Sequence, residues 1–339
     1  GDFVMSTMGT IGKCAIVPPS IQRGIMDSHL IRLRFDDKKI RPDYMLQLFS
    51  DQYHYLSDQT ARLAVGGIMD GLSVGIVSRL NVVYPESLEE QQKIIRTLSE
   101  VDCLITDLQK LIRKKKDIRQ GTMQMLVTGK TRLDGYSGDW VKINLAKNSK
   151  LKARIGWQGL TTAEYLDEGY SFLITGTDFD DGRINWNGCH FVNYDRYVQD
   201  PNIQVTNGDL LLTKDGTIGK VAFVTDLKRP ATLNSGVFLV KPTTGAYTAH
   251  FMFYVLESSV FKEFLQQLSA GSTINHLYQK DLVKFDLFVP PTREEQEAIA
   301  TILFDMDTDI HKLEEKLSKY QKVKQGMMEE LLTGKVRLS

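Results

Sequence analysis

The chain of 339 residues carries one sequence pattern twice. Met5–Ala15 reads MSTMGTIGKCA, and Leu212–Ala222, 207 residues later, reads LTKDGTIGKVA. Pro85–Leu133 matches Pro290–Leu338 at an offset of 205 residues, with about two-fifths of the positions identical. Two collinear matches at nearly one offset indicate a tandem duplication, so the chain is expected to contain two versions of one architecture. Trp140–Asn207 has no counterpart in the first copy, which is therefore shorter by this segment, unless the chain begins inside it.

The part of each copy that precedes the long matching segment has the pattern of a mixed sheet and helix domain. Short alternating apolar runs bounded by Gly, Asn and Asp predict strands at Tyr170–Ile174, Asp209–Thr213 and Val237–Val240. Two shorter helices are expected at Tyr247–Leu268 and at Asp43–Leu56, where Pro42 suits the first turn. We therefore expect an α/β (α+β) globular domain in each copy.

The second part of each copy predicts one long helix. Apolar residues recur at spacings of three and four in both: Leu98, Val101, Ile105, Leu108 and Ile112 in the first, and Leu303, Met306, Ile310, Leu313 and Leu317 in the second. An acidic pair at 89–90 or 294–295 begins each helix, and Gly129 or Gly334 suits its left-handed cap. We expect the two seams to pair as an antiparallel coiled coil. In the alternative arrangement, each seam packs on its own globular domain.

These patterns divide the chain into four segments. Residues 1–84 are expected to form a first globular domain that is incomplete at its N-terminal side, and residues 134–289 a second one. Residues 85–133 and 290–339 are expected to form the long helices. The predicted fold is two mixed α/β domains separated by two long antiparallel coiled-coil helices, with a pseudo-two-fold internal repeat.

Composition limits the class of partner and the compartment. Lys plus Arg is 42 and Asp plus Glu is 42, so the formal net charge is zero and any polyanion site must be local. Cys14, Cys103 and Cys189 lie far apart without metal-ligand spacing, which favours a reducing, cytoplasmic setting. No apolar run approaches the roughly 20 residues that a membrane-spanning helix needs, and no signal peptide opens the chain.

The sequence contains no motif that predicts catalysis. The GTIGK segments are not phosphate-binding loops, because Thr7 and Lys214 stand five residues before Gly12 and Gly219, where that motif requires glycine. HExxH, GxSxG and GxGxxG are absent, and the six histidines show no ligand spacing. We therefore expect a binding protein with no metal and no cofactor.

The order of these segments resembles that of the specificity subunit of type I restriction-modification enzymes. The likeness covers essentially the whole chain. It rests on the GTIGK segments at Gly9 and Gly216, the EEQ helix starts at Glu89 and Glu294 with prolines upstream, and the helix ends LVTGKTRL at Leu126–Leu133 and LLTGKVRL at Leu331–Leu338.

The resemblance implies two target recognition domains, each of which reads one half of a split site in double-stranded DNA. It also implies that the two helices set the spacing and dock two methyltransferase (modification) subunits, with restriction and translocase subunits in the full complex. The short first domain departs from the family pattern. Whether this chain alone reads both half-sites is therefore open, and self-association could restore a complete reader.

Two basic or amide-rich stretches are candidates for DNA contact. Trp140–Gln158 contains five cations and no acid, and Lys152 and Arg154 are its candidates for phosphate contacts, unless the stretch is only a solvated face. The Arg183–Asn187 stretch, RINWN, is expected to be a turn. Its Arg183, Asn185 and Asn187 carry the side chains that bond guanine and adenine in the major groove, although such turns are more often only turns.

The GTIGK segments are candidates because they recur in both copies. Their glycines predict a tight hairpin, from which backbone N–H groups and the side chains of Thr10, Lys13, Thr217 and Lys220 would approach a phosphate. Alternatively, both copies need this turn only to close a sheet. Positions that differ between the copies are better candidates for base reading: Thr7-Met8 against Lys214-Asp215, and Gly67-Ile68 against a stretch containing Ser272, Thr273, Asn275 and His276.

A glycine inside each long helix indicates a partner surface. Gly121 and Gly326 recur at the same position although a helix-interior glycine costs about 1 kcal/mol relative to alanine. Both lie off the apolar seam, beside Met123 and Met328. We hypothesise that these glycine and methionine positions let a methyltransferase helix approach closely.

A second functional class is a coiled-coil adaptor that carries two peptide-binding globular domains. Zero net charge and the helical seams favour it. The basic Trp140–Gln158 stretch disfavours it.

Overall fold

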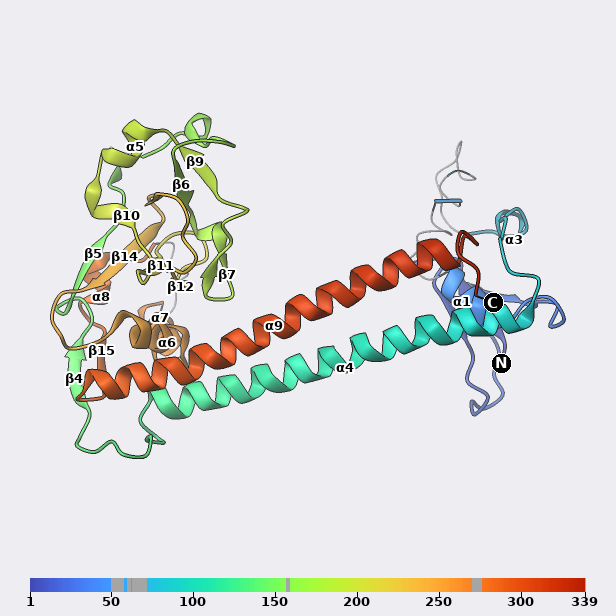
Figure 1. Cartoon of the computed structure of the whole chain (residues 1–339), viewed down its shortest axis with the longest axis horizontal. Helices are drawn as coiled ribbons and strands as arrows, with labels where there is room; N and C mark the ends of the chain where they lie inside the picture. Colours follow the sequence, from blue (N-terminus) through green and yellow to red (C-terminus); the bar gives the residue numbers. More distant parts are fainter. Residues whose placement is uncertain (50–57, 60–61, 63–71, 157–158, 270–275, 339) are drawn as a thin grey trace. The chain divides into compact units, whose positions relative to one another are not determined.

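The computed structural model describes residues 1–49, 58–59, 62, 72–156, 159–269 and 276–338. The chain forms two compact units: unit 1 contains Gly1–Lys114 and Ile310–Ser339, and unit 2 contains Lys115–Asp309. Two long helices, α4 (Leu88–Val127) and α9 (Arg293–Leu331), each contribute to both units (Figure 1). Each unit is therefore built from residues of both sequence copies.

Unit 1 is a small antiparallel sheet that packs against helices. The sheet has the order β2-β1-β3, with β1 at Phe3–Ser6, β2 at Cys14–Ile16 and β3 at Leu30–Leu33. Two short helices follow, α1 (Pro42–Leu48) and α3 (Val74–Val77). The core joins one face of the sheet to α1 and to both long helices through Phe3, Met5, Tyr44, Leu48, Ile94, Leu98, Met328 and Leu331.

Unit 2 contains two four-stranded sheets. The first has the order β12-β11-β14-β5 and comprises β5 (Ser149–Lys152), β11 (Leu210–Thr213), β12 (Val221–Phe223) and β14 (Val237–Pro242). The second has the order β10-β13-β6-β9 and comprises β6 (Ser171–Ile174), β9 (His190–Val192), β10 (Gln204–Val205) and β13 (Ala231–Leu233). The strands predicted from alternating apolar runs correspond to β6, β11 and β14.

Smaller elements complete unit 2. Two strand pairs are β4 (Val141–Asn144) with β15 (Asp286–Val289) and β7 (Phe179–Asp180) with β8 (Arg183–Ile184). The helices are α5 (Tyr194–Val198), α6 (Ala249–Glu257), α7 (Ser259–Leu268) and α8 (Gln279–Leu282), with single 3-10 turns at Thr162–Glu164, Gly176–Asp178 and Pro201–Ile203.

The helix predicted at Tyr247–Leu268 is divided in two. Ser258 ends α6 and begins α7, and its buried hydroxyl accepts from the Val260 N–H at 3.2 Å and donates to the Val255 carbonyl at 2.7 Å. A serine that satisfies both helix ends favours a bend over one continuous helix. Pro42 occupies the first turn of α1 as predicted, and the expected continuation to Leu56 lies mostly outside the described residues.

The sheets of the two units share strand order and register. In unit 1, Phe3 pairs with Ile16 and Leu33; in unit 2, Leu210 pairs with Phe223 and Val240, and each of the three positions is shifted by 207 residues. Register sets which side chains share a face. The duplicated sequence therefore folds into the same three-stranded core twice.

What covers the outer face of this core differs between the units. In unit 2, Leu211, Ala222 and Leu239 are buried beneath the second sheet. Their counterparts in unit 1 are the half-buried Val4 and the exposed Ala15 and Arg32. The buried strand β13 corresponds to 24–26 in unit 1, which forms no strand and leaves Ile25 fully exposed. The difference arises because the other strands of the second sheet come from Trp140–Asn207, the segment without a counterpart in the first copy.

A buried glutamine joins the start of each long helix to its own unit. Gln91 accepts from the Arg41 N–H at 2.9 Å and donates to the carbonyls of Lys39 and Pro85, each at 2.8 Å. The same three bonds recur at Gln296, with Thr248 N–H at 2.8 Å and the Ala246 and Pro290 carbonyls at 3.0 Å. Every partner is a backbone group, so the joint does not depend on the neighbouring side chains.

The helices α4 and α9 lie side by side in opposite directions within each unit. In unit 1, Lys324 contacts Asp102 at 2.6 Å and Arg337 contacts Glu90 at 2.6 Å. In unit 2, the contacts are Lys115–Asp309 at 3.2 Å and Arg119–Asp307 at 2.7 Å between the helices, and Arg132, which follows α4, with Glu295 at 2.8 Å. In both units the residue number rises on one helix as it falls on the other.

The predicted seam residues face inward. Leu98 and Leu303 belong to the cores of units 1 and 2, and Leu108, Ile112 and Ile310 are buried along the helices. The remaining seam positions, Val101, Ile105, Met306, Leu313 and Leu317, are half-buried. The first residue of each seam, Leu98 or Leu303, thus packs in the core of a globular part, as in the alternative arrangement, and the later positions are buried or half-buried along the helices.

The helix ends follow the expected capping chemistry. Each helix carries its acidic pair in the first turn, and Gly129 and Gly334 adopt left-handed conformations with φ of 69° and 75°. Among the described residues, no helix is long and apolar enough to span a membrane.

Candidate DNA-reading and subunit-contact sites

The two GTIGK segments form the same turn. Gly9 and Gly12 have φ of 69° and 80°, and Gly216 and Gly219 have φ of 67° and 86°, in the region that favours glycine. A hydroxyl closes each turn: Ser6 Oγ accepts from the Lys13 N–H, and Thr213 Oγ1 from the Lys220 N–H, both at 2.9 Å.

Several backbone donors of these turns are used inside the hairpin. The Gly12 N–H donates to the Ser6 carbonyl at 2.8 Å, and the Gly219 N–H to the Thr213 carbonyl at 3.1 Å. These donors and the lysine N–H groups are already bonded within the hairpin, which favours the sheet-closing interpretation for this part of the main chain. The side chains of Thr10, Lys13, Thr217 and Lys220 are exposed and stay available for contact.

Residues that differ between the copies gather beside the second turn. Lys214 Nζ lies 3.4 Å from His276 Nε2 and 3.7 Å from Asp215 Oδ2, and the His276 ring also contacts the Asp215 carboxylate. The Lys214 ammonium stands 5.5 Å from the centre of the Phe238 ring. Only 12% of the Lys214 side chain is exposed, against 29% for His276 and 37% for Asp215. Lys214 therefore supports the cluster, while His276 and Asp215 form more of its surface.

The counterpart of Lys214 in unit 1 is Thr7, which is buried. Its backbone repeats the pattern of Lys214: the Leu72 N–H donates to the Thr7 carbonyl at 2.7 Å, and the Leu277 N–H to the Lys214 carbonyl at 2.8 Å. The main-chain hydrogen bond at this position is thus the same in both units, although the side chains differ. The other candidates at divergent positions, Ser272, Thr273, Asn275, Gly67 and Ile68, lie outside the described residues.

The structure corrects the prediction for Arg154. Its side chain is buried, with Nε donating to the Leu233 carbonyl at 2.9 Å and Nη2 to the Thr232 hydroxyl at 3.3 Å. Burial, with Arg196 nearby, lowers the pKa of this guanidinium. Arg154 thus ties the two sheets of unit 2 together and is unavailable to DNA. Lys152, on the edge strand β5, is exposed as a phosphate contact requires.

The RINWN stretch is not one turn. Arg183 and Ile184 form β8, and the tight turn lies just before them at Asp181-Gly182, where both residues have positive φ. Trp186 Nε1 donates to the Thr225 carbonyl at 3.0 Å, which fixes the loop that follows. Asn185 and Asn187 are exposed and Arg183 is half-buried, so all three side chains can reach a ligand.

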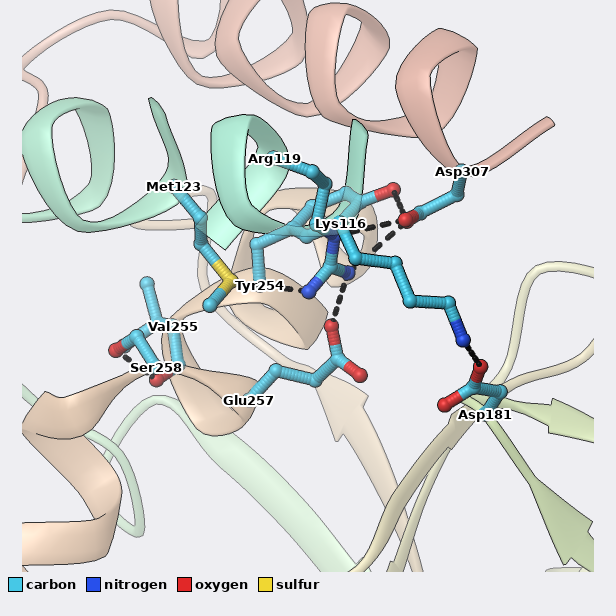
Figure 2. A network of polar contacts seen from close by, with 9 residues as sticks. All are labelled: Lys116, Arg119, Met123, Asp181, Tyr254, Val255, Glu257, Ser258 and Asp307. Atoms are coloured by element: carbon cyan, nitrogen blue, oxygen red, sulfur yellow. Dashed lines mark hydrogen bonds and ion pairs between the residues drawn. The ribbon is translucent and has the colours of Figure 1, made fainter. Parts of the chain in front are cut away.

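An ionic network that the sequence did not reveal joins three helices of unit 2 (Figure 2). Arg119 of α4 bonds both oxygens of Asp307 on α9, at 2.7 and 3.0 Å, and Glu257 at the end of α6, at 2.5 Å. Tyr254 donates its hydroxyl to Asp307 at 2.9 Å. Desolvation raises the pKa of the Glu257 carboxyl, against the opposing effect of Arg119. Lys116, one turn before, reaches Asp181 at 3.3 Å.

The helix glycines lie on open surface, but their methionine neighbours do not. An ideal Cβ at Gly121 or Gly326 would meet no atom within 4 Å outside the helix's own backbone. Met123 and Met328, in contrast, are buried in the cores of units 2 and 1, so the expectation that they flank a docking surface was wrong. A helix turns by about 100° per residue, which carries a position two residues from glycine to the opposite side.

The exposed apolar neighbours of the glycines stand at other spacings. In unit 2, Ile118 and Met125 are 49% and 43% exposed, three residues before and four residues after Gly121. In unit 1, Val323 is 44% exposed, three residues before Gly326. Residues three and four apart share one face of a helix. Each copy therefore presents an exposed β-branched side chain beside an uncovered glycine.

Comparisons with known proteins agree with these features. The family model described as type I restriction modification DNA specificity domain matches residues 1–120 and 135–322. The chain is 25% identical over 334 residues to the type I restriction enzyme MjaVIII specificity subunit of Methanocaldococcus jannaschii, covering 94% of this chain and 75% of that protein. It is 26% identical over 351 residues to the putative MjaX specificity subunit of the same organism, covering 100% of this chain and 79% of that protein.

Solved structures show the same fold at low sequence identity. The S subunit of the type I restriction-modification system from M. genitalium superposes with a TM-score of 0.66 at 14% identity, covering 98% of this chain and 82% of that chain. A chain from a study of type I R-M complex assembly and conformational transition gives a TM-score of 0.55 at 17% identity, covering 98% and 81%. Since the family model covers most of its length, the chain belongs to the type I restriction modification DNA specificity domain family.

Proposed function

We propose that this chain is the non-catalytic, sequence-reading subunit of a type I restriction-modification complex. Residues 1–84 and 134–289 serve as target recognition domains, and residues 85–133 and 290–339 as the helices between them. The observation that carries the proposal is one sheet built twice in the same register, with different side chains at Thr7 and Lys214 beside the shared turn. A repeated scaffold with divergent side chains suits the reading of two different half-sites.

The residues around each turn divide into two roles. Thr10, Lys13, Thr217 and Lys220, which both copies share, contact phosphates and position the domain. In the second domain, His276 and Asp215, held by Lys214, and Arg183, Asn185 and Asn187 on the β7–β8 side are the candidates for contacts with base edges. Ser272, Thr273 and Asn275, which lie outside the described residues, remain candidates from the sequence.

Selection of bound duplexes tests this function. The complex with methyltransferase subunits is incubated with a library of random duplexes, and the bound fraction is sequenced. We expect a motif of two short specific parts separated by a non-specific spacer. Because the chain has no net charge, the subunit alone should bind more weakly than the complex. Binding without sequence enrichment would contradict the proposal.

We further propose that α4 and α9 act as an antiparallel coiled coil, related by the pseudo-two-fold repeat, that sets the spacer. The cross-helix ion pairs in each unit and the buried seam support this arrangement. Adding or removing one heptad in both helices should change the preferred spacer in the duplex selection. An unaltered spacer would show that the helices do not set it.

The exposed faces at Ile118, Gly121 and Met125 and at Val323 and Gly326 are the proposed docking sites for two methyltransferase subunits. Glycine lets a partner helix approach closely, and the apolar neighbours supply the contact. Leucine at both glycines should abolish co-purification of the methyltransferase while circular dichroism stays unchanged. Undiminished assembly would place docking elsewhere.

A further inference from the structure

Arg119 is the residue through which α4, α9 and α6 meet in unit 2 (Figure 2). Its planar guanidinium bonds Asp307 with two nitrogens and Glu257 with one, and lies 5.6 Å from the centre of the Tyr254 ring. The side chains of Arg119, Glu257 and Asp307 are only 15%, 20% and 25% exposed. A planar fork with several donors suits two carboxylates at once, which a lysine ammonium cannot match in geometry.

The part of this network that joins the two long helices is duplicated. Arg119 and Asp307 correspond, at the offset of 205 residues, to Lys324 and Asp102, which pair in unit 1 at 2.6 Å. A basic residue on one helix and an aspartate on the other therefore hold α4 and α9 together in both units. The bond from Arg119 to Glu257 adds a third element, because Glu257 ends α6 of the globular part.

The helix α6 in turn holds the β7–β8 turn. Gly182 packs so closely on Phe253 of α6 that an added Cβ would stand 2.6 Å from the ring. Lys116 binds the neighbouring Asp181, and Arg183 follows in β8. A change in how α6 sits on the long helices would therefore be transmitted to Arg183 and its turn.

We propose that Arg119 is a positioning residue that fixes the second recognition domain on the helix pair and thereby narrows the range of spacer lengths the protein accepts. This inference rests on the proposed function, because it presumes that two half-sites are read. Removing Arg119 outright would leave two partly buried carboxylates facing one another, which is strongly destabilising. The informative variants keep either the positive charge at residue 119 or the size of the side chain at residue 257.

The first variant is Arg119→Lys, which copies the residue at 324 and retains a cation opposite Asp307. The second is Glu257→Gln, which keeps the size of the side chain and weakens only the bond to α6. Each is purified with the methyltransferase subunits and given a duplex library in which both half-sites are fixed and the spacer length varies. Loss of one charged hydrogen bond should reduce the preference for the best spacer over its neighbours by about tenfold.

The matched control is Lys115→Met. It removes a cross-helix ion pair one turn away, Lys115–Asp309, whose side chains are 40% and 58% exposed and which does not involve α6. Its spacer preference should equal that of the unaltered protein, since exposed pairs contribute little.

The outcomes separate the two claims. Broadened spacer preference in both variants, with unchanged half-site sequences and an unchanged control, supports the role of Arg119. Spacer preference as narrow as in the unaltered protein overturns that role and leaves the proposed function intact. Absence of any split motif with the unaltered complex overturns the proposed function, and this inference with it.

Discussion

At the scale of single residues, the structure separates side chains that hold the scaffold from side chains that face outward. Gln91 and Gln296 show the first kind, since each is buried and makes three bonds to backbone groups. Lys220 shows the second, an exposed cation on a turn whose backbone is already bonded. The two kinds should respond differently to substitution.

Alanine at Gln91 or Gln296 should lower stability by about 1–3 kcal/mol, because buried backbone groups lose their partners. The equal geometry at both positions predicts losses of similar size. Thermal or chemical denaturation of each variant measures them, with Gln92→Ala, an exposed neighbour, as the control. A variant at Gln296 as stable as this control would show that the three bonds contribute nothing net.

Lys214→Thr, which installs the residue of the first copy, should change which sequence the second domain prefers. Lys214 holds His276 and Asp215, so its loss should displace them, and loss of one base contact made by either corresponds to about 1–3 kcal/mol of discrimination. Lys220→Met should instead weaken binding evenly across sequences, as expected for a phosphate contact. Duplex selection with both variants and the unaltered protein makes the comparison. Identical enriched motifs for all three proteins would show that Lys214 does not influence base reading.

At the scale of elements, two segments at equivalent positions of the repeat differ: 231–233 is a buried strand in unit 2, and 24–26 is exposed and forms no strand in unit 1. Leu233 of β13 is fully buried, and its counterpart Met26 is 46% exposed outside any strand. The two segments occupy equivalent positions in the repeat but differ in sequence, Gly-Ile-Met against Ala-Thr-Leu, and only the segment that pairs with the second sheet forms a strand. Burial by a second sheet is therefore the main difference between the two globular parts.

Leu233→Ala should cost about 2–5 kcal/mol, and Met26→Ala should cost less than about 0.5 kcal/mol. Each variant serves as the other's matched control because the two positions are equivalent in the repeat. Calorimetry of both proteins measures the difference. Comparable losses would mean that the 24–26 segment is covered in solution.

The long helices carry a second element-scale prediction. Alanine at Gly121 and at Gly326 should stabilise the protein by up to about 1 kcal/mol each, because alanine is the better helix former and its methyl group meets no neighbouring atom. Chemical denaturation measures this gain in the isolated subunit. A loss of stability would indicate that the glycines serve the fold itself.

At the scale of the whole molecule, an arginine that follows one long helix bonds a glutamate at the start of the other long helix in each unit. Arg132 follows the first helix and bonds Glu295, at the start of the second, in unit 2. Arg337 follows the second helix and bonds Glu90, at the start of the first, in unit 1. Each unit thus contains an ion pair that joins the two sequence copies.

The bond from Arg337 holds the pKa of the Glu90 carboxyl below its usual range. Because the folded-state pKa is the lower one, this stabilisation is present above the ordinary glutamate pKa and is lost as pH falls through the folded value. Melting temperatures of the protein and of Glu90→Gln, measured from neutral to acid pH, should therefore converge at low pH. A constant difference would show that ionisation of Glu90 does not stabilise unit 1.

Much of this architecture could be read from the sequence, because periodicity and repetition report on elements directly. The helix ends at Gly129 and Gly334, the strands at 171–174 and 210–213 and the family followed from such patterns. Contacts between residues far apart in the chain could not be predicted from these patterns. Arg154 appeared to be one of several surface cations until the fold buried it, and Met123 appeared exposed until α4 met the core of unit 2. The sequence showed Arg119 only as one cation of a basic helix face, since its partners lie 138 and 188 residues away.

The buried glutamines have a consequence for inheritance. Gln296 bonds only main-chain atoms. If recombination replaced residues 134–289 as a block, the chain would therefore receive a foreign domain without losing the three bonds of Gln296. Glu257 is different, since it lies inside the exchanged block and meets Arg119 through its own carboxylate. Domains exchanged between lineages should therefore be free to diverge over most of their length. They should, however, retain an acidic residue at the end of α6.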